Sequence, residues 1–380
     1  MAQTIPFVDL SFQHEPLQAQ IEQLWRDCIA QGQFILGPHL AAFEQAFAAA
    51  SGVAHGIGVA SGTDALALGM RAAGIQAGDE VLVPANTFIA TLIGILRTGA
   101  TPVLVDCDPD TALIDLEAAV QNITPRTKAI APVHLYGQLV APQALKDFAQ
   151  SHNLLIIEDA AQAHLAHRDG ITAGSIGTVA AYSFYPSKNL GAMGDGGMVL
   201  TDDPEIARKI RAYRNYGARE KYIHQEWGTN SRLDNLQAAV LSLKLPQLPA
   251  WNAARNQRAE QYNAALAPLP GICPLVNHSG PGHSYHLYVI RVQPPHQREK
   301  LQAALMAAGI QTGIHYPIPC HLQPAYRFLG YQLGDFPNTE QLAGEILSLP
   351  MYPGLTAAQV EAVVQAIRDS VPIATHGSSH

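Results

Sequence analysis

Apolar positions along the chain alternate between helical and strand spacing. A first helix is predicted near the N-terminus, where one face carries Leu17, Ile21, Leu24, Trp25, Cys28 and Ile29. Residues 55–70 are typical of a strand, a tight turn and a helix, and the same unit recurs at 80–96 and 128–149. Residues 101–106 and 154–160 contain short apolar runs without alternation, as in strands buried on both faces. The pattern predicts an α/β fold with a mostly parallel central sheet flanked by helices.

The second half of the chain continues this pattern and then changes character. After helices at 204–217 and 232–245, Pro246 and Pro249 interrupt the periodicity. The rest predicts a smaller α+β unit, with helices at 251–266, 296–309 and 357–370 and strands at 284–292 and 310–316. We expect a large domain with the N-terminal helices, a small C-terminal domain, and a tag or tail, over residues 1–248, 249–375 and 376–380.

Composition narrows the class of protein. Hydrophobic residues make up 48% and charged residues 14% of the 380 residues, which is a globular composition. The formal net charge of -8 argues against nucleic acid as a partner, because a phosphate backbone is bound by clustered Lys and Arg. Four well-separated cysteines without a CxxC pair favour free thiols in a reducing compartment. With no signal peptide and no apolar run near the ~20 residues of a membrane helix, we expect a soluble cytoplasmic protein with no membrane partner.

Lys188 is the first candidate for chemistry. It lies in the stretch SFYPSKNLGAMGDGG, between a predicted strand and four glycines, whereas most other lysines fall in helical patterns. A lysine that forms a Schiff base must reach a carbonyl while being shielded enough to lose its proton, and nearby glycines let a planar cofactor approach the backbone. Taken alone, the residue also fits a solvated lysine in a surface loop.

Asp159 is the second candidate, at the carboxyl end of a buried strand, which faces the ligand crevice in open α/β sheets. A carboxylate there needs a cationic partner, and the protonated ring nitrogen of pyridoxal phosphate is one. The alternative is a helix N-cap.

The third candidate is the turn formed by Ser61, Gly62 and Thr63, where a predicted strand leads into a helix. Free amides at a helix N-terminus bind a phosphate, although Ser61 and Asp64 also fit an ordinary capping box. The order of the phosphate turn, Asp159 and Lys188, each after a strand of one sheet, favours a pyridoxal-phosphate site over three coincidences.

Competing motifs are weaker. His164 and His167 form an HxxH without a nearby Cys or Glu cluster, so we expect no metal site. The chain contains no GxSxG, HExxH or P-loop motif, and the glycine run leads into a strand, unlike a dinucleotide fingerprint.

At these residues the chain resembles the DegT/StrS family of nucleotide-sugar aminotransferases, which are fold-type I pyridoxal-phosphate enzymes. The resemblance covers nearly the whole chain and rests on motifs that include SGTDALALGM, VLVPANTFIAT, PVHLYGQ, IIEDAAQAH, SFYPSKNLGAMGDGG, NSRLDNLQAA and HYPIPCHLQPAY. It implies a large domain that binds the cofactor and a homodimer with active sites shared between the subunits.

The resemblance also implies roles for individual residues. Lys188 would form the Schiff base and carry the proton in transamination, and Asp159 would pair with the pyridine nitrogen. The other cofactor contacts would be Gln162 to the ring hydroxyl, Phe88 stacked on the ring, and Gly62, Thr63, Ser183 and, from the neighbouring subunit, Asn230 at the phosphate.

The substrate is less closely specified. The motif with His134, Leu135 and Tyr136 resembles family members that aminate a 3-keto sugar. Arg219 and Lys221 suit a pyrophosphate as two local cations, although a solvated loop is the alternative. The candidate contacts to a dTDP-linked or UDP-linked sugar are Tyr185, Arg219, Lys221, Tyr222, His315 and Tyr316.

The expected chemistry is a ping-pong transamination. By family analogy L-glutamate donates its amino group, the cofactor passes through pyridoxamine phosphate, and the keto sugar accepts the amine. Alternative readings are a 4-keto-sugar aminotransferase, a keto-inositol aminotransferase, and a non-catalytic protein that binds pyridoxal phosphate or a sugar nucleotide.

Overall fold

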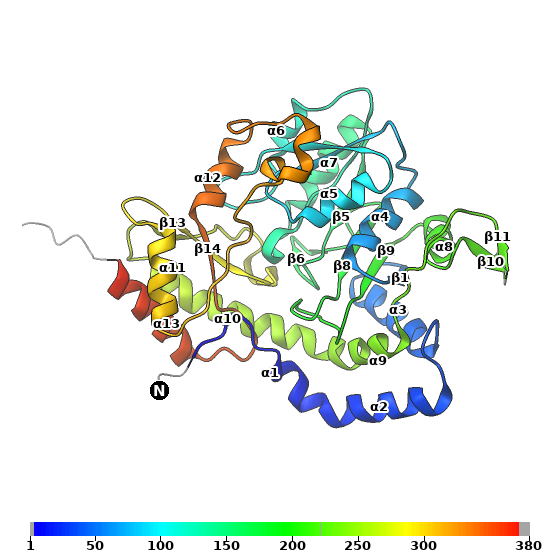
Figure 1. Cartoon of the computed structure of the whole chain (residues 1–380), viewed down its shortest axis with the longest axis horizontal. Coiled ribbons are helices and arrows are strands. Elements are labelled where there is room, and N and C mark those ends of the chain that lie inside the picture. The colour runs from blue at the N-terminus through cyan, green and yellow to red at the C-terminus, as the bar shows by residue number, and fades with distance from the viewer. Residues whose placement is uncertain (1–3, 221, 372–380) are drawn as a thin grey trace, which may run out of the picture.

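The computed structural model describes residues 4–220 and 222–371, and for Arg219 it describes the backbone alone. Its core is a seven-stranded sheet in the order β1-β9-β8-β5-β4-β2-β3 (Figure 1). The strands are β1 His55–Val59, β2 Glu80–Pro84, β3 Thr101–Val105, β4 Thr127–Ile130, β5 Leu155–Asp159, β8 Val179–Ser183 and β9 Gly197–Thr201. Strands β3, β2, β4, β5 and β8 run parallel, and β9 is antiparallel to both of its neighbours. The predicted mostly parallel sheet is confirmed.

Helices cover both faces of this sheet. On one face an apolar cluster joins Phe43 and Phe47 of α3 to Tyr182 of β8, and on the other Leu66 of α4 and Leu92 of α5 pack against Ala181. Residues of β8 alternate between the two clusters, because successive strand side chains point to opposite faces. The helices of this part are α1 Ser11–His14, α2 Gln18–Gln31, α3 Pro38–Ala50, α4 Gly62–Ala72, α5 Ile89–Leu96, α6 Leu116–Val120, α7 Pro142–His152, α8 Pro204–Tyr213 and α9 Asn235–Lys244.

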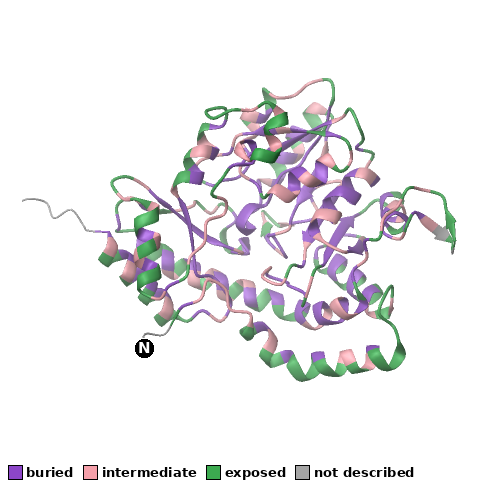
Figure 2. Ribbon diagram, in the orientation of Figure 1, coloured by how far each residue is buried: buried purple, intermediate pink, exposed green. Residues whose placement is uncertain are grey.

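A smaller antiparallel sheet follows in the order β12-β13-β14. Its own apolar cluster joins the sheet to α10, α11 and α13, and the colouring by burial separates these buried faces from the exposed ones (Figure 2). The elements are α10 Leu248–Leu266, β12 Ile272–Pro274, β13 Tyr288–Val292, α11 Arg298–Ala307, α12 Pro337–Glu345, β14 Ile346–Leu349 and α13 Ala357–Ser370. The start of α10 lies beside the predicted domain boundary, and the division itself stays a prediction.

Two hairpins and six short 3-10 helices complete the described part of the chain. The hairpins pair β6 His167–Arg168 with β7 Ile171–Thr172, and β10 Ala218–Glu220 with β11 Ile223–His224. The 3-10 helices are Glu15–Leu17, Leu135–Gly137, Leu245–Gln247, Gly280–Gly282, Cys320–Leu322 and Pro324–Leu329. Across residues 4–220 and 222–371, no helix is both long and apolar enough to cross a membrane.

Two local predictions were wrong. Residues 310–316 form no strand; Ile310 and Gly313 make only isolated bridges, to Ile5 and Ser348. This segment was predicted as a strand of the small α+β unit, but β14 pairs with β13 in the small sheet instead. Ile29 was predicted on the buried face of the first helix, yet 66% of its surface is exposed.

Candidate active site

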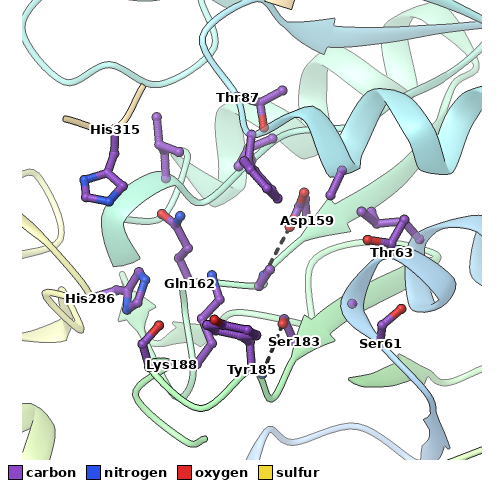
Figure 3. Close-up of a pocket in the computed structure, with 18 of the residues that line it drawn as sticks. Ser61, Thr63, Thr87, Asp159, Gln162, Ser183, Tyr185, Lys188, His286 and His315 are labelled. Atoms are coloured by element: carbon purple, nitrogen blue, oxygen red, sulfur yellow. Dashed lines mark hydrogen bonds between the residues drawn. The ribbon is translucent and has the colours of Figure 1, made fainter. Parts of the chain in front are cut away.

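A cavity of about 340 Å³ opens at the carboxyl ends of β5 and β8 (Figure 3). Ligand crevices of open α/β sheets lie at this edge of the sheet. The cavity is lined by ten of the residues predicted from the sequence: Gly62, Thr63, Phe88, Asp159, Gln162, Ser183, Tyr185, Lys188, His315 and Tyr316. Residues from both halves of the chain therefore meet at one site.

Lys188 lies half-buried in the turn after β8 and lines the cavity. Its backbone N–H donates to the Tyr185 carbonyl at 2.8 Å, which closes this turn. Burial lowers the pKa of its amine to about 8, against the opposing attraction of Asp159. Lys188 therefore lines a cavity instead of lying in a fully solvated surface loop, and burial favours the neutral form of its amine.

The glycines around Lys188 serve contacts within the chain. A Cβ atom on Gly191 would lie 2.2 Å from the Pro186 carbonyl oxygen, and one on Gly197 would lie 2.3 Å from the Ser61 carbonyl oxygen. A Cβ atom on Gly62 would lie 2.7 Å from the Cβ of Ser183. Gly62 and Gly197 thus let the start of α4 approach the end of β8, which brings the two halves of the predicted phosphate site together.

Asp159 ends β5 and is almost fully buried at the cavity wall. Its Oδ2 accepts a hydrogen bond of 2.7 Å from the Thr91 hydroxyl, and its Oδ1 accepts one of 3.1 Å from the Ala161 amide. Desolvation is the largest influence and raises the pKa of the carboxyl, while these two bonds and Lys188 oppose it. No helix begins after Asp159, so the N-cap alternative was wrong; the sequence reasoning also missed Thr91.

The start of α4 combines a cap with unpaired amides. The Ser61 hydroxyl accepts a hydrogen bond of 3.1 Å from the Asp64 amide, as an N-cap does. The Asp64 carboxylate binds Arg97 and the Ser231 hydroxyl, so the reciprocal bond of a capping box is missing. Within the described chain the amides of Gly62 and Thr63 have no acceptor. This end of the helix therefore retains donors for an anion.

Gln162 connects the cavity to the 134–136 motif. Its Oε1 accepts a hydrogen bond of 2.6 Å from the Tyr136 amide, and its Nε2 donates to the Tyr316 hydroxyl at 3.3 Å. The Tyr136 hydroxyl donates to the His315 carbonyl, and the Phe88 and Tyr316 rings lie 5.2 Å apart. Both outer residues of the motif, His134 and Tyr136, are buried behind the wall, and only Leu135 lines the cavity.

A buried pair stands behind Asp159 that sequence reasoning did not identify. His134 Nε2 lies 3.0 Å from Glu158 Oε2, and both side chains are fully buried. Because His134 Nδ1 accepts from the Val140 amide at 3.3 Å, its Nε2 carries the proton and donates to Glu158. Glu158 also accepts from the amides of residues 174, 176 and 177. The Glu158 carboxylate thus fixes the loop between β5 and β8.

The remaining predicted residues lie elsewhere. Asn230 and Tyr222 are exposed and do not line this chain's cavity, while Lys221 and the Arg219 side chain lie outside the described residues. His164 is buried and donates to the Ser183 carbonyl, whereas His167 is exposed. In the part of the chain that the structure describes, no three His, Cys, Asp or Glu side chains gather as metal ligands. Lining residues that were not singled out from the sequence include Thr87 and Asp195, which lie inside two of the quoted motifs, and His286, which lies in none of them.

The donor set of the cavity fits pyridoxal phosphate. Asp159 is a buried carboxylate that forms no ion pair with any described residue, so a cationic ring nitrogen would satisfy it. Lys188 supplies an amine with a lowered pKa, and the unpaired amides of α4 supply donors for a phosphate. These features define a site for a lysine-bound, anionic, aromatic cofactor.

Comparison with known proteins assigns the chain and its fold to one family. The model of the DegT/DnrJ/EryC1/StrS aminotransferase family matches residues 16–368, and the chain belongs to this family. The dTDP-3-amino-3,4,6-trideoxy-alpha-D-glucose transaminase of Streptomyces venezuelae is 45% identical, over 96% of this chain and 96% of that protein. The UDP-N-acetyl-3-dehydro-alpha-D-glucosamine 3-aminotransferase of Acidithiobacillus ferrooxidans is 43% identical, over 96% of this chain and 97% of that protein.

Solved structures agree with the fold. The structure of Streptomyces venezuelae DesV in complex with a ketimine intermediate superposes with a TM-score of 0.94 and 44% identity, covering 97% of this chain and 99% of that one. The structure of Bacillus subtilis NtdA with bound cofactor PMP gives a TM-score of 0.89 and 31% identity, covering 98% of this chain and 86% of that one. The predicted family and fold class are confirmed.

Proposed function

We propose that this protein is a pyridoxal-phosphate-dependent aminotransferase that moves the amino group of L-glutamate to the 3-keto group of a nucleotide-linked sugar. One observation carries the proposal: the amine of Lys188, the buried Asp159 carboxylate and the amides at the start of α4 line one cavity. The names of the relatives, a dTDP-sugar transaminase and a UDP-sugar 3-aminotransferase, support the substrate class.

Different residues of the cavity would hold different parts of the cofactor. Lys188 would bind it covalently, and Asp159 would accept a hydrogen bond from its ring nitrogen. The amides of Gly62 and Thr63 and the Ser183 hydroxyl would hold its phosphate, Phe88 would stack on its ring, and Gln162 would bond the ring hydroxyl. When bound, pyridoxal phosphate supplies an electron sink for the carbon that loses its proton.

Lys188 is also the group that moves the proton. Its lowered pKa keeps a fraction of the amine neutral near physiological pH, as a general base requires. With the cofactor bound, Lys188 would take up the proton that the amino acid loses and would hold it as an ammonium until it is returned. Asp159 would place its carboxylate against the ring nitrogen.

The substrate would bind at the open side of the cavity. Tyr185, His315 and Tyr316 line this cavity and offer hydrogen bonds to a sugar. Arg219, Lys221 and Tyr222, which lie close together in the sequence, are proposed as contacts to the pyrophosphate and nucleotide. The relatives carry different nucleotides, dTDP and UDP, so the proposal covers both.

We also propose that the enzyme acts as a homodimer in the cytoplasm. Three large aromatic side chains are exposed: Phe88 and Tyr185 at the cavity, with exposed fractions of 51% and 55%, and Trp227 away from it, with 87%. A subunit interface would cover such groups. The hairpin of β10 and β11 extends away from the core (Figure 1). Asn230 follows this hairpin in the sequence and bridges to Asn215, and it is proposed to contact the partner's cavity.

Two experiments test the function. Purified protein is loaded with pyridoxal phosphate and titrated with L-glutamate, and loss of the visible absorption band is recorded beside Lys188→Ala and the exposed control Lys300→Ala. Bleaching in the wild type and the control, but not in Lys188→Ala, is expected. A band indifferent to every amino acid would favour a non-catalytic protein that binds the cofactor or a sugar nucleotide.

The regiochemistry is tested separately. The loaded enzyme is incubated with dTDP-linked and UDP-linked 3-amino sugars, their 4-amino isomers and an amino-inositol, and conversion of the cofactor is followed in the reverse direction. Conversion by the 3-amino sugars alone is expected. Conversion by a 4-amino sugar or an amino-inositol would replace the proposal by the corresponding aminotransferase.

A further inference from the structure

His286 is a cavity residue with no role in the site described above. It precedes β13, lines the cavity beside Lys188, and is drawn on the same side of the cavity as that lysine in Figure 3. Its Nδ1 lies 3.2 Å from Oδ1 of Asn189, the residue that follows Lys188 in the chain. His286 and the Lys188 turn are thus joined by a side-chain contact.

The direction of this contact is fixed by two backbone carbonyls. Asn252 Nδ2 donates to the His164 carbonyl at 2.9 Å, so Asn252 Oδ1 is available as an acceptor for Asn189 Nδ2 at 2.9 Å. Asn189 Nδ2 also donates to the Ser284 carbonyl at 2.7 Å. Carbonyl oxygens only accept, so both amides can point in one direction only.

This arrangement determines where His286 carries its proton. Asn189 Oδ1 can only accept, so His286 Nδ1 must bear the hydrogen and donate it. Burial, with the nearby charges of Lys188 and Arg255, lowers the pKa of His286 well below its usual range, and the ring is neutral. Its Nε2 therefore presents a lone pair, and no described residue donates to it.

Two other imidazoles near Lys188 do not offer such an acceptor to the cavity. His164 is fully buried behind the wall and does not line the cavity. His315 lines it, but its Nδ1 pairs with the Ser348 hydroxyl at 2.9 Å, and a hydroxyl can donate or accept. Of the two described histidines that line the cavity, His286 is the one whose neighbours fix both the tautomer and the free lone pair.

We infer that His286 Nε2 is the hydrogen-bond acceptor for the ammonium of Lys188 when that lysine is free of the cofactor and carries the transferred proton. The inference rests on the proposed function. A neutral acceptor stabilises the ammonium without adding a carboxylate that would hold the proton too tightly. The hydrogen bond to Asn189 holds His286 Nε2 in place relative to Lys188, because Asn189 and Lys188 belong to the same turn.

The tautomer is tested first, on the protein without cofactor. Histidine-selective ¹⁵N NMR, with His286 assigned by its loss in His286→Gln, is expected to report a neutral ring protonated at Nδ1 from pH 6 to 8. A ring protonated at Nε2, or a cation in this range, would overturn the inference. This result does not depend on any transamination.

The contact with Lys188 is tested in the pyridoxamine-phosphate form, which leaves the lysine free. ¹³C NMR of ε-labelled lysine gives the pKa of Lys188, whose other charged or titratable neighbours are Asp159, His164 and His315. In His286→Phe this pKa is expected to fall by about one unit, because a hydrogen bond to a charged group is lost. An unchanged pKa in His286→Phe would overturn the inference, and the exposed control His278→Phe should leave it unchanged.

Single-turnover kinetics test whether His286 Nε2 accepts its hydrogen bond from Lys188 or from a hydroxyl of the sugar. His286→Phe is expected to slow both the glutamate and the amino-sugar half-reaction by about tenfold, since Lys188 carries the proton in both. His286→Gln, which retains an acceptor oxygen, should recover part of this loss. Slowing of the amino-sugar half-reaction alone would assign Nε2 to the sugar and overturn the inference. A wild type inert to glutamate would refute the proposed function and leave the two NMR results standing.

Discussion

The Thr91 hydroxyl donates a 2.7 Å hydrogen bond to Oδ2 of Asp159. Among the described residues, Thr91 is the only one whose side chain donates to this carboxylate. Thr91 is itself fully buried and lies 2.8 Å, hydroxyl to hydroxyl, from Thr87 on the cavity wall. Since the Thr91 proton points at Asp159, Thr87 donates to Thr91. A helix residue from α5 thus orients the carboxylate that ends β5.

Thr91→Val is therefore expected to weaken cofactor binding. The isosteric change removes a bond that opposes the raised pKa of Asp159, so the carboxyl holds its proton to higher pH and attracts the ring nitrogen less. The expected loss in affinity for pyridoxal phosphate is about tenfold, from the cost of one hydrogen bond to a charged group. Equilibrium titration of the absorption band measures it, and Thr91→Ser, which keeps the hydroxyl, should bind nearly as the wild type.

Cofactor capture should depend on pH through Lys188. Only the neutral amine attacks the aldehyde, and burial lowers the pKa of Lys188 from 10.5 to about 8. The rate at which the cofactor-free protein captures pyridoxal phosphate should rise as pH increases through about 8 and level off above it. Stopped-flow absorbance between pH 6.5 and 9.5 checks this. A midpoint near 10.5 would mean that the amine is solvated.

Gly62→Ala is expected to separate α4 from β8. The new Cβ would lie 2.7 Å from the Ser183 Cβ, so the helix start or the strand end must shift. Overpacking of this kind costs about 1–3 kcal/mol of the free energy of unfolding, and cofactor affinity should fall with it. Chemical denaturation and cofactor titration measure both effects.

Gly344→Ala is the matched control for this substitution. Gly344 lies exposed in α12 with no atom within 4 Å of its Cβ position, so the change should be neutral or stabilising by up to about 1 kcal/mol. If Gly344→Ala destabilised the protein as much as Gly62→Ala, close packing at Ser183 would not explain the loss.

Glu158→Gln should lower the free energy of unfolding although Glu158 does not line the cavity. Glu158 accepts hydrogen bonds from His134 and from three backbone amides, and a glutamine amide would place N–H donors against some of them. Leaving buried donors unpaired costs roughly 1–3 kcal/mol each, so a loss of about 3 kcal/mol in the free energy of unfolding is expected. Urea denaturation measures it, and the exposed control Glu361→Gln should change it little.

Much of the site was predictable because its parts follow strands. The apolar runs that end at Asp159 and Ser183 predict buried parallel strands, and such strands deliver their last residues to a common edge. Lys188, five residues beyond Ser183, follows from the same reasoning. Candidate catalytic residues that follow strand ends can therefore be recognised from the order of residues along the chain.

Other contacts could not be predicted because they join segments without a shared pattern. Thr91 meets Asp159 across 68 positions of sequence, and His286 reaches the Lys188 turn through Asn189 from 97 positions away. No periodicity in a single chain encodes such side-chain pairs.

The sequence by itself therefore determined the fold class, the parallel strands and the residues at their ends, because apolar spacing decides which faces are buried. Only the tertiary structure decided how those residues are oriented and which tautomer or protonation state they adopt. It assigned the glycines to close backbone contacts, the Thr91 hydroxyl to Asp159, and one tautomer to His286. Orientation, tautomer and pKa depend on neighbours in space, and the packing of distant segments sets those neighbours.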